Sequence, residues 1–303
     1  MPSRPESGAI RAVNRPVLAH RMTPFWLRPV LFVLVCFAGV MGMLYAVQRS
    51  LIYFPGRMSR AEFEATAAHV SGTRGAVLAP FDAVVFEPPS GMPIVATAVY
   101  FHGNAGTALD RSYLAAVFTG RGVRLVLAEY PGYGARDGAP SQESLVDDAR
   151  KLYAKVTAAY PASPLMLVGE SLGSGVAVQV AASSPAQPPT RLVLLTPFLS
   201  LAETAARTYW FLPVRYLVKD RFDSQGRLDR YRGPVAILIA GRDEVVGASQ
   251  GRELAALSRS RGHTVAVELP DAGHNNWSVL VSDAQWTELL GCPPSLTVDP
   301  AGG

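Results

Sequence analysis

The chain has 303 residues, of which 49% are hydrophobic and 17% are charged. This length and composition exclude a mostly disordered chain and allow a substantial core. The 2 cysteines cannot staple a scaffold, and they do not have the spacing of a metal site. The formal charge of +4 is concentrated in the first 60 residues, which hold eight basic residues and one acid, so the remainder is slightly acidic. A body without a basic excess gives no support to a nucleic-acid partner.

Residues 29–47 form a 19-residue apolar segment near the N-terminus. At about 1.5 Å per residue a helix of this length spans roughly 28 Å, close to the thickness of the hydrocarbon core of a bilayer. Trp26 and Tyr45 lie near its ends, where amphipathic rings favour the membrane interface. Five arginines precede the segment, so we expect a basic cytoplasmic tail over 1–28, a single transmembrane anchor, and a body on the extracytoplasmic side, the periplasm in a Gram-negative bacterium. A cleaved signal peptide and a helix buried in the fold are the alternatives.

From about residue 80, short aliphatic runs alternate with longer amphipathic segments. Most of the short runs are continuously apolar, which is typical of strands buried on both faces of a parallel sheet. Helices are expected over 141–160, where apolar residues follow a 3.6 period, and over 172–183. This alternation predicts a layered α/β fold, with helices on both faces of a mostly parallel sheet. The expected strands are Ala83–Phe86, Ala96–Tyr100, Arg124–Glu129, Leu165–Gly169, Arg191–Leu195, Val235–Ala240 and Thr264–Leu269.

The rest of the chain is divided by composition. Residues 48–79 are expected to be a linker and a lead-in to the sheet, and 80–290 to form the α/β domain. Residues 291–303 are rich in proline and glycine and are expected to be a disordered tail. Inside the domain, 196–231 separates two strands and is too long for a plain loop. Its large apolar side chains fit either a cap that forms the wall of an acyl-chain pocket or a scaffold helix with a tight apolar linker.

The sequence Gly169-Glu170-Ser171-Leu172-Gly173 follows an expected strand and opens an expected helix. A G-x-S-x-G motif in this strand–turn–helix context predicts a serine nucleophile on a tight turn. The glycines let the strand and the helix pass close together. The serine hydroxyl then lies near a helix N-terminus, where negative charge is stabilised. A chance glycine pattern at an ordinary turn is the alternative.

A serine nucleophile needs a general base, and His274 is the candidate. It lies in a loop after the last expected strand, from which its side chain can reach Ser171. The acid that orients the histidine should follow an intermediate strand, and Asp243 directly follows the penultimate one. The chain order serine, aspartate, histidine fits this arrangement. Glu244, which is one step farther along the turn, and Asp271, in the histidine loop, are the rival acids.

Two backbone N–H groups are expected to stabilise the oxyanion of such a reaction. One is that of Leu172, directly after the nucleophile. The other comes from the glycine-containing loop after the strand Ala96–Tyr100, where Asn104 is the expected donor. His102 lies in the same loop, and its place at a strand end favours a structural role over that of a catalytic base. The candidate substrate contacts are His102, Gly103, Phe198 and Trp210.

Together these features resemble the α/β-hydrolase superfamily, and in particular its membrane-anchored α/β-hydrolase-domain proteins. The resemblance covers residues 30–290 and rests on seven motifs in order. They are Gln48-Arg49-Ser50-Leu51-Ile52-Tyr53-Phe54-Pro55, His102-Gly103-Asn104-Ala105-Gly106, Tyr130-Pro131-Gly132-Tyr133-Gly134, Gly169-Glu170-Ser171-Leu172-Gly173-Ser174-Gly175, Thr196-Pro197-Phe198, Asp243-Glu244-Val245-Val246 and Gly273-His274-Asn275. The resemblance implies a Ser–Asp–His hydrolase with the Asn104 and Leu172 N–H groups as its oxyanion hole.

The sequence also departs from the pattern of this family. Glu129 and Pro131 stand where the family usually has Asp and Arg, and Gly247 stands where it usually has Pro. The acid also follows its preceding glycine one residue sooner than usual. The three triad residues are unaffected, so the departures concern the local shape of the acid loop and of the tyrosine-rich loop.

These features predict a membrane-anchored serine hydrolase that cleaves carboxylic esters or thioesters through an acyl-enzyme intermediate. The membrane tether favours lipid-like acyl substrates by proximity, and other small acyl compounds also fit the chemistry. No cofactor or metal is expected, because the mechanism needs only water and the sequence has no metal-ligand cluster or phosphate loop. A serine peptidase of the same fold and a non-catalytic scaffold or binding protein are the alternatives.

Overall fold

The computed structural model describes residues 25–70, 76–78, 81–183, 186–260 and 262–292. Most of the expected basic tail (1–28) and nearly all of the expected C-terminal tail (291–303) therefore lie outside the described residues. The chain divides into two compact units, Met1–Ala46 and Val47–Gly303. The second unit contains the whole α/β domain.

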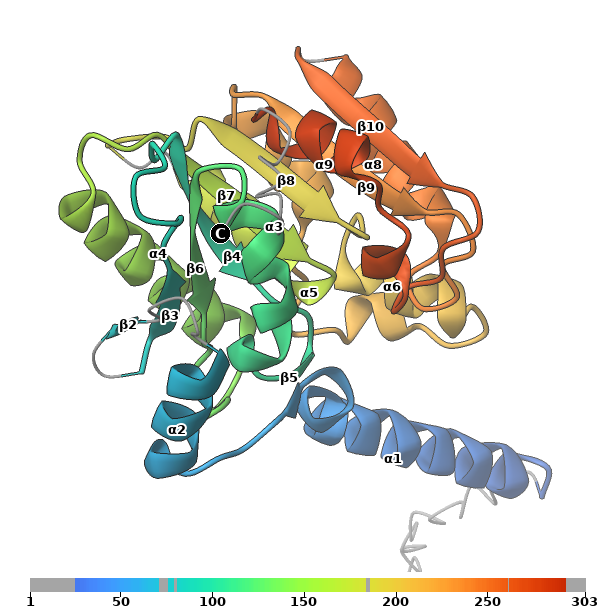
Figure 1. Ribbon diagram of the computed structural model, residues 1–303. Helices are drawn as coiled ribbons and strands as arrows, with labels where there is room; N and C mark the ends of the chain where they lie inside the picture. Colours follow the sequence, from blue (N-terminus) through green and yellow to red (C-terminus); the bar gives the residue numbers. More distant parts are fainter. Residues whose placement is uncertain (1–24, 71–75, 79–80, 184–185, 261, 293–303) are drawn as a thin grey trace, which may run out of the picture. The chain divides into compact units, whose positions relative to one another are not determined.

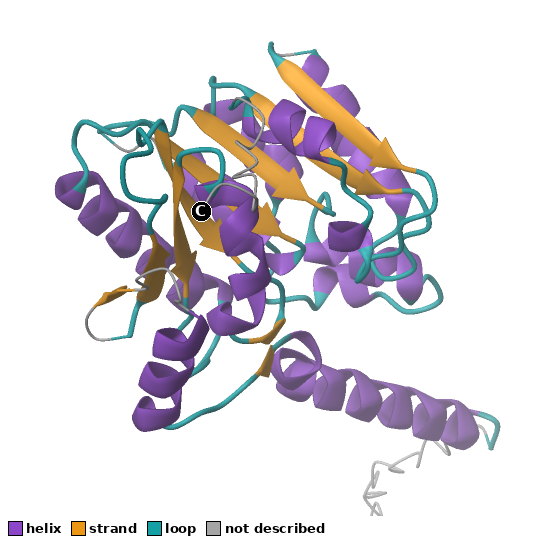
Figure 2. Cartoon of the chain, viewed as in Figure 1, coloured by secondary structure: helices purple, strands orange, loops and turns teal. Residues whose placement is uncertain are grey.

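An eight-stranded sheet forms the centre of this second unit (Figures 1 and 2). The strand order is β10-β9-β8-β7-β4-β6-β3-β2, and only the pairs β2–β3 and β3–β6 are antiparallel. The strands are β2 (Ala76–Leu78), β3 (Ala83–Phe86), β4 (Ala96–Phe101), β6 (Val123–Ala128), β7 (Leu165–Glu170), β8 (Arg191–Leu195), β9 (Val235–Ala240) and β10 (Thr264–Leu269). All strands except β2 were expected at these positions, so the predicted mostly parallel sheet is confirmed.

Helices cover both faces of the sheet, as the figures show (Figure 2). One face packs against α4 (Gln142–Ala159), α5 (Leu172–Ala181) and α8 (Ala248–Arg259). The opposite face packs against α2 (Arg60–Val70), α3 (Ala115–Thr119) and α9 (Asp283–Leu290). Because side chains alternate along a strand, Val99 and Phe101 of β4 join the first layer, whereas Ala98 and Tyr100 join the second. The predicted layered α/β architecture is therefore confirmed.

The two helices expected over 141–160 and 172–183 are present as α4 and α5. The hydroxyl of Ser141 accepts a hydrogen bond of 3.0 Å from the N–H of Ser144, which caps α4. The apolar stripe of α4 is buried along its length, from Leu145 to Val156. All ten residues of α5 are buried, so this helix lies inside the domain. Its position directly after β7 places its N-terminus at the carboxyl edge of the sheet.

The segment 196–231 follows β8 and contains short helices rather than a single long one. They are α6 (Leu201–Thr208), η2 (Val214–Tyr216), α7 (Ser224–Arg227) and η3 (Leu228–Arg230). Two further short 3₁₀ helices lie elsewhere, η1 (Ala108–Leu114) and η4 (Trp277–Val279). We call residues 196–231 the insert.

The N-terminal helix α1 (Leu27–Ile52) is apolar and long enough to cross a membrane. It begins in the first unit, and its last residues, from Val47 onward, belong to the second. The strand β1 (Phe54–Pro55) follows it and pairs in parallel with β5 (Ala105–Gly106). Residues 48–79 therefore do more than link two parts, since they contribute β1, α2 and the edge strand β2 to the second unit.

Candidate active site

The turn between β7 and α5 presents Ser171 in a strained backbone conformation. Its φ of 50° and ψ of −116° lie in a region that residues other than glycine rarely adopt. A Cβ atom on Gly169 would lie 2.3 Å from the carbonyl oxygen of Gly173. A Cβ atom on Gly173 would lie 2.0 Å from the carbonyl oxygen of Phe101. The strand and the helix therefore approach so closely that both positions require glycine, as the motif predicted.

The structure brings Ser171, Asp243 and His274 into one chain of hydrogen bonds. The Nε2 atom of His274 lies 2.8 Å from the Oγ of Ser171, and its Nδ1 lies 2.8 Å from the Oδ2 of Asp243. Because the carboxylate can only accept, Nδ1–H donates to it and Nε2 is left to accept the serine hydroxyl proton. The side chains of Asp243 and His274 are 2% and 8% exposed. This arrangement suits the histidine to withdraw a proton from the serine.

A short loop after β9 holds the carboxylate of Asp243. Its Oδ1 accepts hydrogen bonds of 2.9 Å from the N–H groups of both Val245 and Val246. Burial acts to raise the pKa of Asp243, but the hydrogen bond and charge of His274, together with these two N–H groups, outweigh burial and lower the pKa. The next residue, Gly247, has a φ of 86°, which proline cannot adopt. The departure from the family pattern at this position therefore matches a loop with its own backbone shape.

The two rival acids are used elsewhere. Glu244 accepts a hydrogen bond of 3.4 Å from the backbone N–H of His274, so it contacts the histidine loop and not the ring. Asp271 forms an exposed ion pair of 2.6 Å with Arg242. Asp243 is the acid that the structure places on the imidazole.

The loop after β4 is held by the residues that follow α1. The carbonyl oxygen of Asn104 accepts hydrogen bonds from the N–H of Phe54 at 2.9 Å and from the hydroxyl of Tyr133 at 2.8 Å. The side-chain amide of Asn104 donates to the carbonyl oxygen of Ile52 at 2.8 Å. These contacts fix the peptide group that follows Asn104 and the Asn104 side chain. Leu172, the other expected donor, is the first residue of α5, where an N–H has no partner within its own helix.

His102 and Phe198 do not lie where a substrate can contact their side chains. His102 is 1% exposed. Its Nδ1–H donates to the carbonyl oxygen of Gly103 at 2.8 Å, and its Nε2 lies 3.2 Å from Glu129. Phe198 is also 1% exposed and packs on α5 against Gly175. The expectation of direct substrate contact by these two rings is therefore corrected, because burial assigns them to the support of the site.

An ion pair between Arg111 and Glu170 lies beside Ser171, and no pattern in the sequence predicted it. The carboxylate of Glu170 accepts hydrogen bonds from the Nε of Arg111 at 2.9 Å, from its Nη2 at 3.2 Å and from the hydroxyl of Tyr100 at 2.9 Å. The Arg111 guanidinium also lies against Gly103 and Gly106 of the loop that contains Asn104. This bidentate pair is mostly buried and joins the residue before Ser171 to that loop. A charge pair 59 residues apart has no local pattern that would have revealed it.

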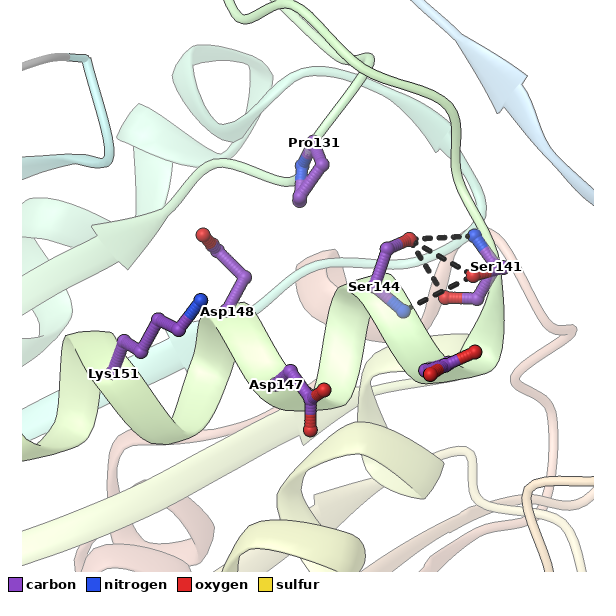
Figure 3. A pocket seen from close by; sticks show the side chains of 7 residues that line it. Pro131, Ser141, Ser144, Asp147, Asp148 and Lys151 are labelled. Carbon is purple, nitrogen blue, oxygen red and sulfur yellow. Dashed lines mark hydrogen bonds between the residues drawn. The ribbon is translucent and has the colours of Figure 1, made fainter.

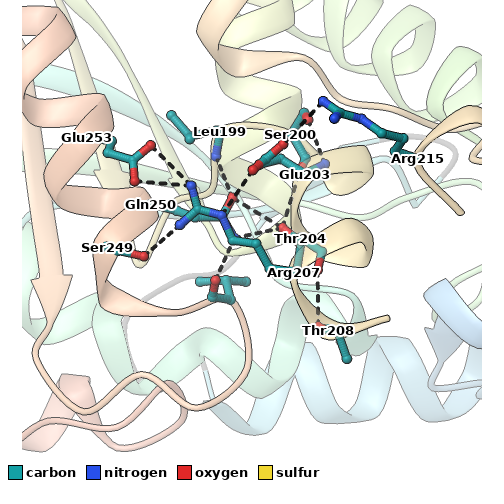
Figure 4. A network of polar contacts seen from close by, with 11 residues as sticks. Leu199, Ser200, Glu203, Thr204, Arg207, Thr208, Arg215, Ser249, Gln250 and Glu253 are labelled. Carbon is teal, nitrogen blue, oxygen red and sulfur yellow. Dashed lines mark hydrogen bonds and ion pairs between the residues drawn. The ribbon is translucent and has the colours of Figure 1, made fainter. Parts of the chain in front are cut away.

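A network of polar contacts connects the insert to α8 (Figure 4). Arg207 of α6 donates hydrogen bonds to Ser249 at 2.7 Å and to Glu253 at 3.1 Å, and it pairs with Glu203 on its own helix at 3.1 Å. Gln250 is completely buried in the same network. Arg207 lies on the exposed side, so its ion pairs are screened by solvent.

Gln250 joins the insert to the acid loop. Its side-chain oxygen accepts the N–H of Leu199 at 3.1 Å, and its side-chain nitrogen donates to the carbonyl oxygen of Val246 at 2.5 Å. Val246 is one of the three residues whose N–H groups bind Asp243. The position of the acid loop therefore depends on a buried amide that lies outside the predicted motifs.

Replacing Gln250 by leucine is expected to lower the free energy of unfolding by about 1–3 kcal/mol, because the Leu199 N–H and the Val246 carbonyl lose their buried partner. Chemical denaturation followed by circular dichroism measures this change. The matched control is Arg207→Gln, from the exposed side of the same network, with an expected loss of under about 1 kcal/mol. Equal losses in the two variants would contradict the role given to Gln250.

A surface depression of about 380 Å³ lies beside the start of α4 (Figure 3). Four of its polar side chains, Ser141, Ser144, Asp147 and Asp148, have structural partners. Ser141 and Ser144 cap the helix, and Asp148 forms hydrogen bonds of 2.6 and 2.7 Å with Arg136. None of the triad residues lines the depression, so it is separate from the candidate active site. Within the described ranges, no three histidine, cysteine or acidic residues are grouped so that they could hold a metal ion.

Comparison with known proteins places the chain in a family. A family described as "Serine aminopeptidase, S33" matches residues 93–224. An uncharacterized protein of Mycobacterium tuberculosis (strain CDC 1551 / Oshkosh) is 34% identical over 250 residues, which cover 80% of this chain and 86% of that protein. The lysophosphatidylserine lipase ABHD12 of Danio rerio is 33% identical over 197 residues, which cover 58% of this chain and 51% of the lipase.

Solved structures share the fold at lower sequence identity. The Pyrococcus furiosus esterase Pf2001 superimposes with a TM-score of 0.59 at 18% identity, covering 79% of this chain and 95% of the esterase. An α/β hydrolase from Vibrio vulnificus gives a TM-score of 0.53 at 17% identity, covering 74% of this chain and 90% of that protein. At these identities the likeness concerns the fold. Together with the related sequences, it shows that the chain belongs to the α/β-hydrolase superfamily.

Proposed function

We propose that this protein is a membrane-anchored serine hydrolase that cleaves carboxylic esters or thioesters. The observation that supports this most directly is the continuous contact from Ser171 Oγ through the His274 ring to Asp243, with 2.8 Å at each step. This geometry suits proton transfer from the serine to the imidazole. The membership of a hydrolase superfamily agrees with it.

In the proposed reaction, the Ser171 oxygen attacks the acyl carbon while Nε2 of His274 takes the hydroxyl proton. The same proton then passes to the leaving alcohol or thiol, and the acyl group stays on the serine. A water molecule then gives a proton to His274 and bonds through its oxygen to the acyl carbon. The bond from the acyl carbon to Ser171 breaks, His274 returns the proton to the serine oxygen, and the acid is released. The lowered pKa of Asp243 keeps its carboxylate ionised, so that it orients and stabilises the imidazolium throughout.

The oxyanion of each tetrahedral intermediate would bind the N–H groups of Leu172 and Asn104. Leu172 supplies an N–H at the start of α5, where the helix dipole also favours negative charge. The carbonyl oxygen of Gly103, in the same peptide group as the Asn104 N–H, accepts a hydrogen bond from the His102 ring, and Phe54 and Ile52 hold Asn104 itself, so this donor is preorganised before substrate binds. Preorganised donors stabilise the transition state without a cost of reorganisation.

The proposed anchor is α1, with residues 29–47 in the bilayer. A helix of 26 residues spans about 39 Å, which is enough to cross the hydrocarbon core and leave its last turn outside. The arginines that precede it favour a cytoplasmic N-terminus, which places the catalytic domain on the extracytoplasmic side. In this organisation the hydrolase domain comprises 80–290 together with β1, α2 and β2 from residues 48–79.

Lipid-like esters are the favoured substrates. The anchor would keep the domain at a membrane surface, and a relative of the chain, ABHD12, is named a lysophosphatidylserine lipase. A serine peptidase of the same fold would use the same three residues on an amide bond. A panel of esters, thioesters and aminoacyl amides offered to the same preparation separates these two possibilities.

The test of the proposed function is labelling with a fluorophosphonate probe, read out by intact mass. The probe forms a bond between its phosphorus and an activated serine oxygen, and fluoride leaves. We expect one adduct on the wild-type protein and none on Ser171→Ala. A folded wild-type protein without an adduct would reject the hydrolase proposal in favour of a binding protein. An adduct that persists in the variant would place the nucleophile elsewhere.

A further inference from the structure

The residue that follows the proposed anchor segment is bound to the insert. Gln48 donates a hydrogen bond through its side-chain nitrogen to the carbonyl oxygen of Leu217 at 3.1 Å. Its side-chain oxygen accepts the backbone N–H of Lys219 at 2.7 Å. One amide therefore satisfies two backbone groups of the insert, as a neighbouring strand would. The apolar run of the anchor ends at Val47, so these bonds hold the insert beside the point where the chain leaves the bilayer.

A second contact fixes the same end of the insert. The carboxylate of Asp220 is 5% exposed and accepts hydrogen bonds from Arg49 at 3.0 and 3.3 Å and from the hydroxyl of Tyr53 at 2.9 Å. A buried carboxylate with three charge-assisted or hydroxyl donors is costly to separate from them. The insert is therefore attached to the last turn of α1 by two adjacent sets of hydrogen bonds, those of Gln48 and those of Asp220, which we call the locks. They keep this part of the insert next to α1.

Beyond these locks, the insert exposes large aromatic side chains. Trp210 is 81% exposed, Phe211 is 65% exposed and Tyr216 is 78% exposed. The rings of Trp210 and Phe211 contact each other, with centroids 5.9 Å apart. We call these three residues the aromatic face. The stretch 209–219, which contains them, carries two basic residues and no acid. Large aromatic groups exposed within seven residues of the chain are unusual on a protein surface and point to a binding role.

We propose that the aromatic face binds the surface of the bilayer in which α1 is anchored. This inference rests on the anchor in the proposed function, and it adds a second membrane contact made by the catalytic unit itself. Three observations favour lipid as the occupant. The two contacts to Gln48 and Asp220 place the face within a few residues of the membrane exit, and tryptophan and tyrosine favour the interface. Arg215, which stays 57% exposed in its 3.8 Å pair with Glu203, suits anionic headgroups.

The same contact would bring the bilayer close to the nucleophile. The insert begins at Thr196, directly after β8, and the N–H of Ser171 donates to the carbonyl oxygen of the preceding Leu195 at 2.9 Å. The first residue of the insert therefore follows a strand residue that is bonded to Ser171. Farther along the insert, Leu217 and Lys219 are bonded to Gln48, where the chain would emerge from the membrane. A substrate that resides in the bilayer, with its ester at the headgroup level, would need to leave the lipid by only a short distance.

The test uses the four tryptophans of the full-length chain in vesicles of phosphatidylcholine and phosphatidylglycerol that carry acyl-brominated lipids. Trp277 and Trp286 are 2% and 4% exposed, so they serve as a background that bromine does not reach. In Trp26→Phe the remaining exposed tryptophan is Trp210, and in Trp210→Phe it is Trp26. The double variant gives the baseline. We expect bromolipid to remove about a third of the emission of Trp26→Phe, because one tryptophan of three contacts lipid, and almost none of that of the double variant.

The outcomes separate this inference from the proposed function. Quenching of Trp26 without quenching of Trp210 would overturn the aromatic face as a membrane contact and leave the anchor in place. This result is expected if the aromatic face is covered by a second copy of the chain or is folded over the active site. Quenching of neither overturns the anchor and, with it, the inference. Neither reading depends on catalysis, so failure of the fluorophosphonate reaction would not affect them.

A kinetic measurement tests the consequence for substrates. The double variant Phe211→Ser/Tyr216→Ser is expected to raise the apparent KM for an ester embedded in vesicles by about ten-fold, and to leave hydrolysis of a soluble butyrate ester unchanged. A matched loss on the soluble ester would overturn the inference in favour of an acyl-pocket wall. An unchanged KM for the vesicle substrate would overturn it as well.

Discussion

Replacing Ser171 by alanine is expected to lower kcat for a soluble short-chain ester by about 10⁵-fold, with KM nearly unchanged. The variant cannot form the acyl-enzyme, so only the oxyanion donors and substrate binding remain to accelerate hydrolysis. The missing oxygen contacts the His274 ring and no core group, so the melting temperature should change little. Steady-state kinetics and thermal unfolding of the same full-length preparation measure both effects.

The matched control is Ser183→Ala, which removes the same atom near the end of α5. The Ser183 hydroxyl donates to the carbonyl oxygen of Val180 at 2.6 Å and takes no part in the triad. We expect activity within about two-fold of wild type, because surface substitutions of this kind have small effects. Residual activity of the Ser171 variant within ten-fold of wild type would contradict the assigned nucleophile, since removing such a group costs several orders of magnitude.

Replacing Gly173 by alanine is expected to destabilise the domain by about 3 kcal/mol or more, because the new Cβ overlaps backbone and not a movable side chain. It would lie 2.0 Å from the carbonyl oxygen of Phe101 and 2.6 Å from that of His102. Relief requires α5 to move away from β4, which displaces both Ser171 and the loop that carries Asn104. We therefore expect loss of fluorophosphonate labelling together with a lower melting temperature.

Gly103→Ala is the control for this prediction. A Cβ there would contact Arg111, Glu170 and Ser171 at 3.6–3.7 Å, which is an ordinary van der Waals distance. This variant should keep the melting temperature within a few degrees of wild type, even if substrate binding changes. A Gly173→Ala protein with the melting temperature of wild type would contradict this prediction, because it would mean that α5 and β4 can accommodate the added Cβ atom.

The strands were predictable because burial on both faces leaves continuous apolar runs. β3, β8, β9 and β10 have the bounds that their composition indicated, β4 and β7 extend one residue farther, and β6 is shifted by one residue. β1 and β5 were not predictable, because strands of two residues have no periodicity and are defined by a partner far away in the chain. The antiparallel edge β2 is also short. Local pattern thus predicted the centre of the sheet and missed the pieces that are held by long-range pairing.

The sequence indicated that Ser171, Asp243 and His274 come together, because each follows a strand whose carboxyl end faces the same edge of the sheet. Their mutual distances, and the use of Val245 and Val246 as donors to the carboxylate of Asp243, required the fold. The same holds for Arg111 and Glu170, which form a pair only after β4 and β7 become neighbours.

Substrate contact by His102 and Phe198 was predicted from their places in the loop after β4 and in the insert, and both side chains are only 1% exposed. A motif position indicates which loop a residue belongs to. It does not indicate whether its side chain turns outward or into the layer beneath. The aromatic side chains of the insert illustrate the same point. Their sequence did not indicate whether they are buried or exposed, and the structure shows that Trp210, Phe211 and Tyr216 are exposed.

Because β1 pairs with β5, the last turn of α1 and the hydrolase domain form one structural unit. A soluble derivative cut at the apparent domain border, residue 80, would lack the Phe54 N–H and the Ile52 carbonyl that hold the Asn104 loop. Recombination that exchanges one membrane anchor for another has to join the pieces before Val47. Under the proposed organisation the membrane-spanning part of α1 makes none of these contacts, whereas Ile52 and Phe54 are bonded to the Asn104 loop about fifty positions farther along the chain.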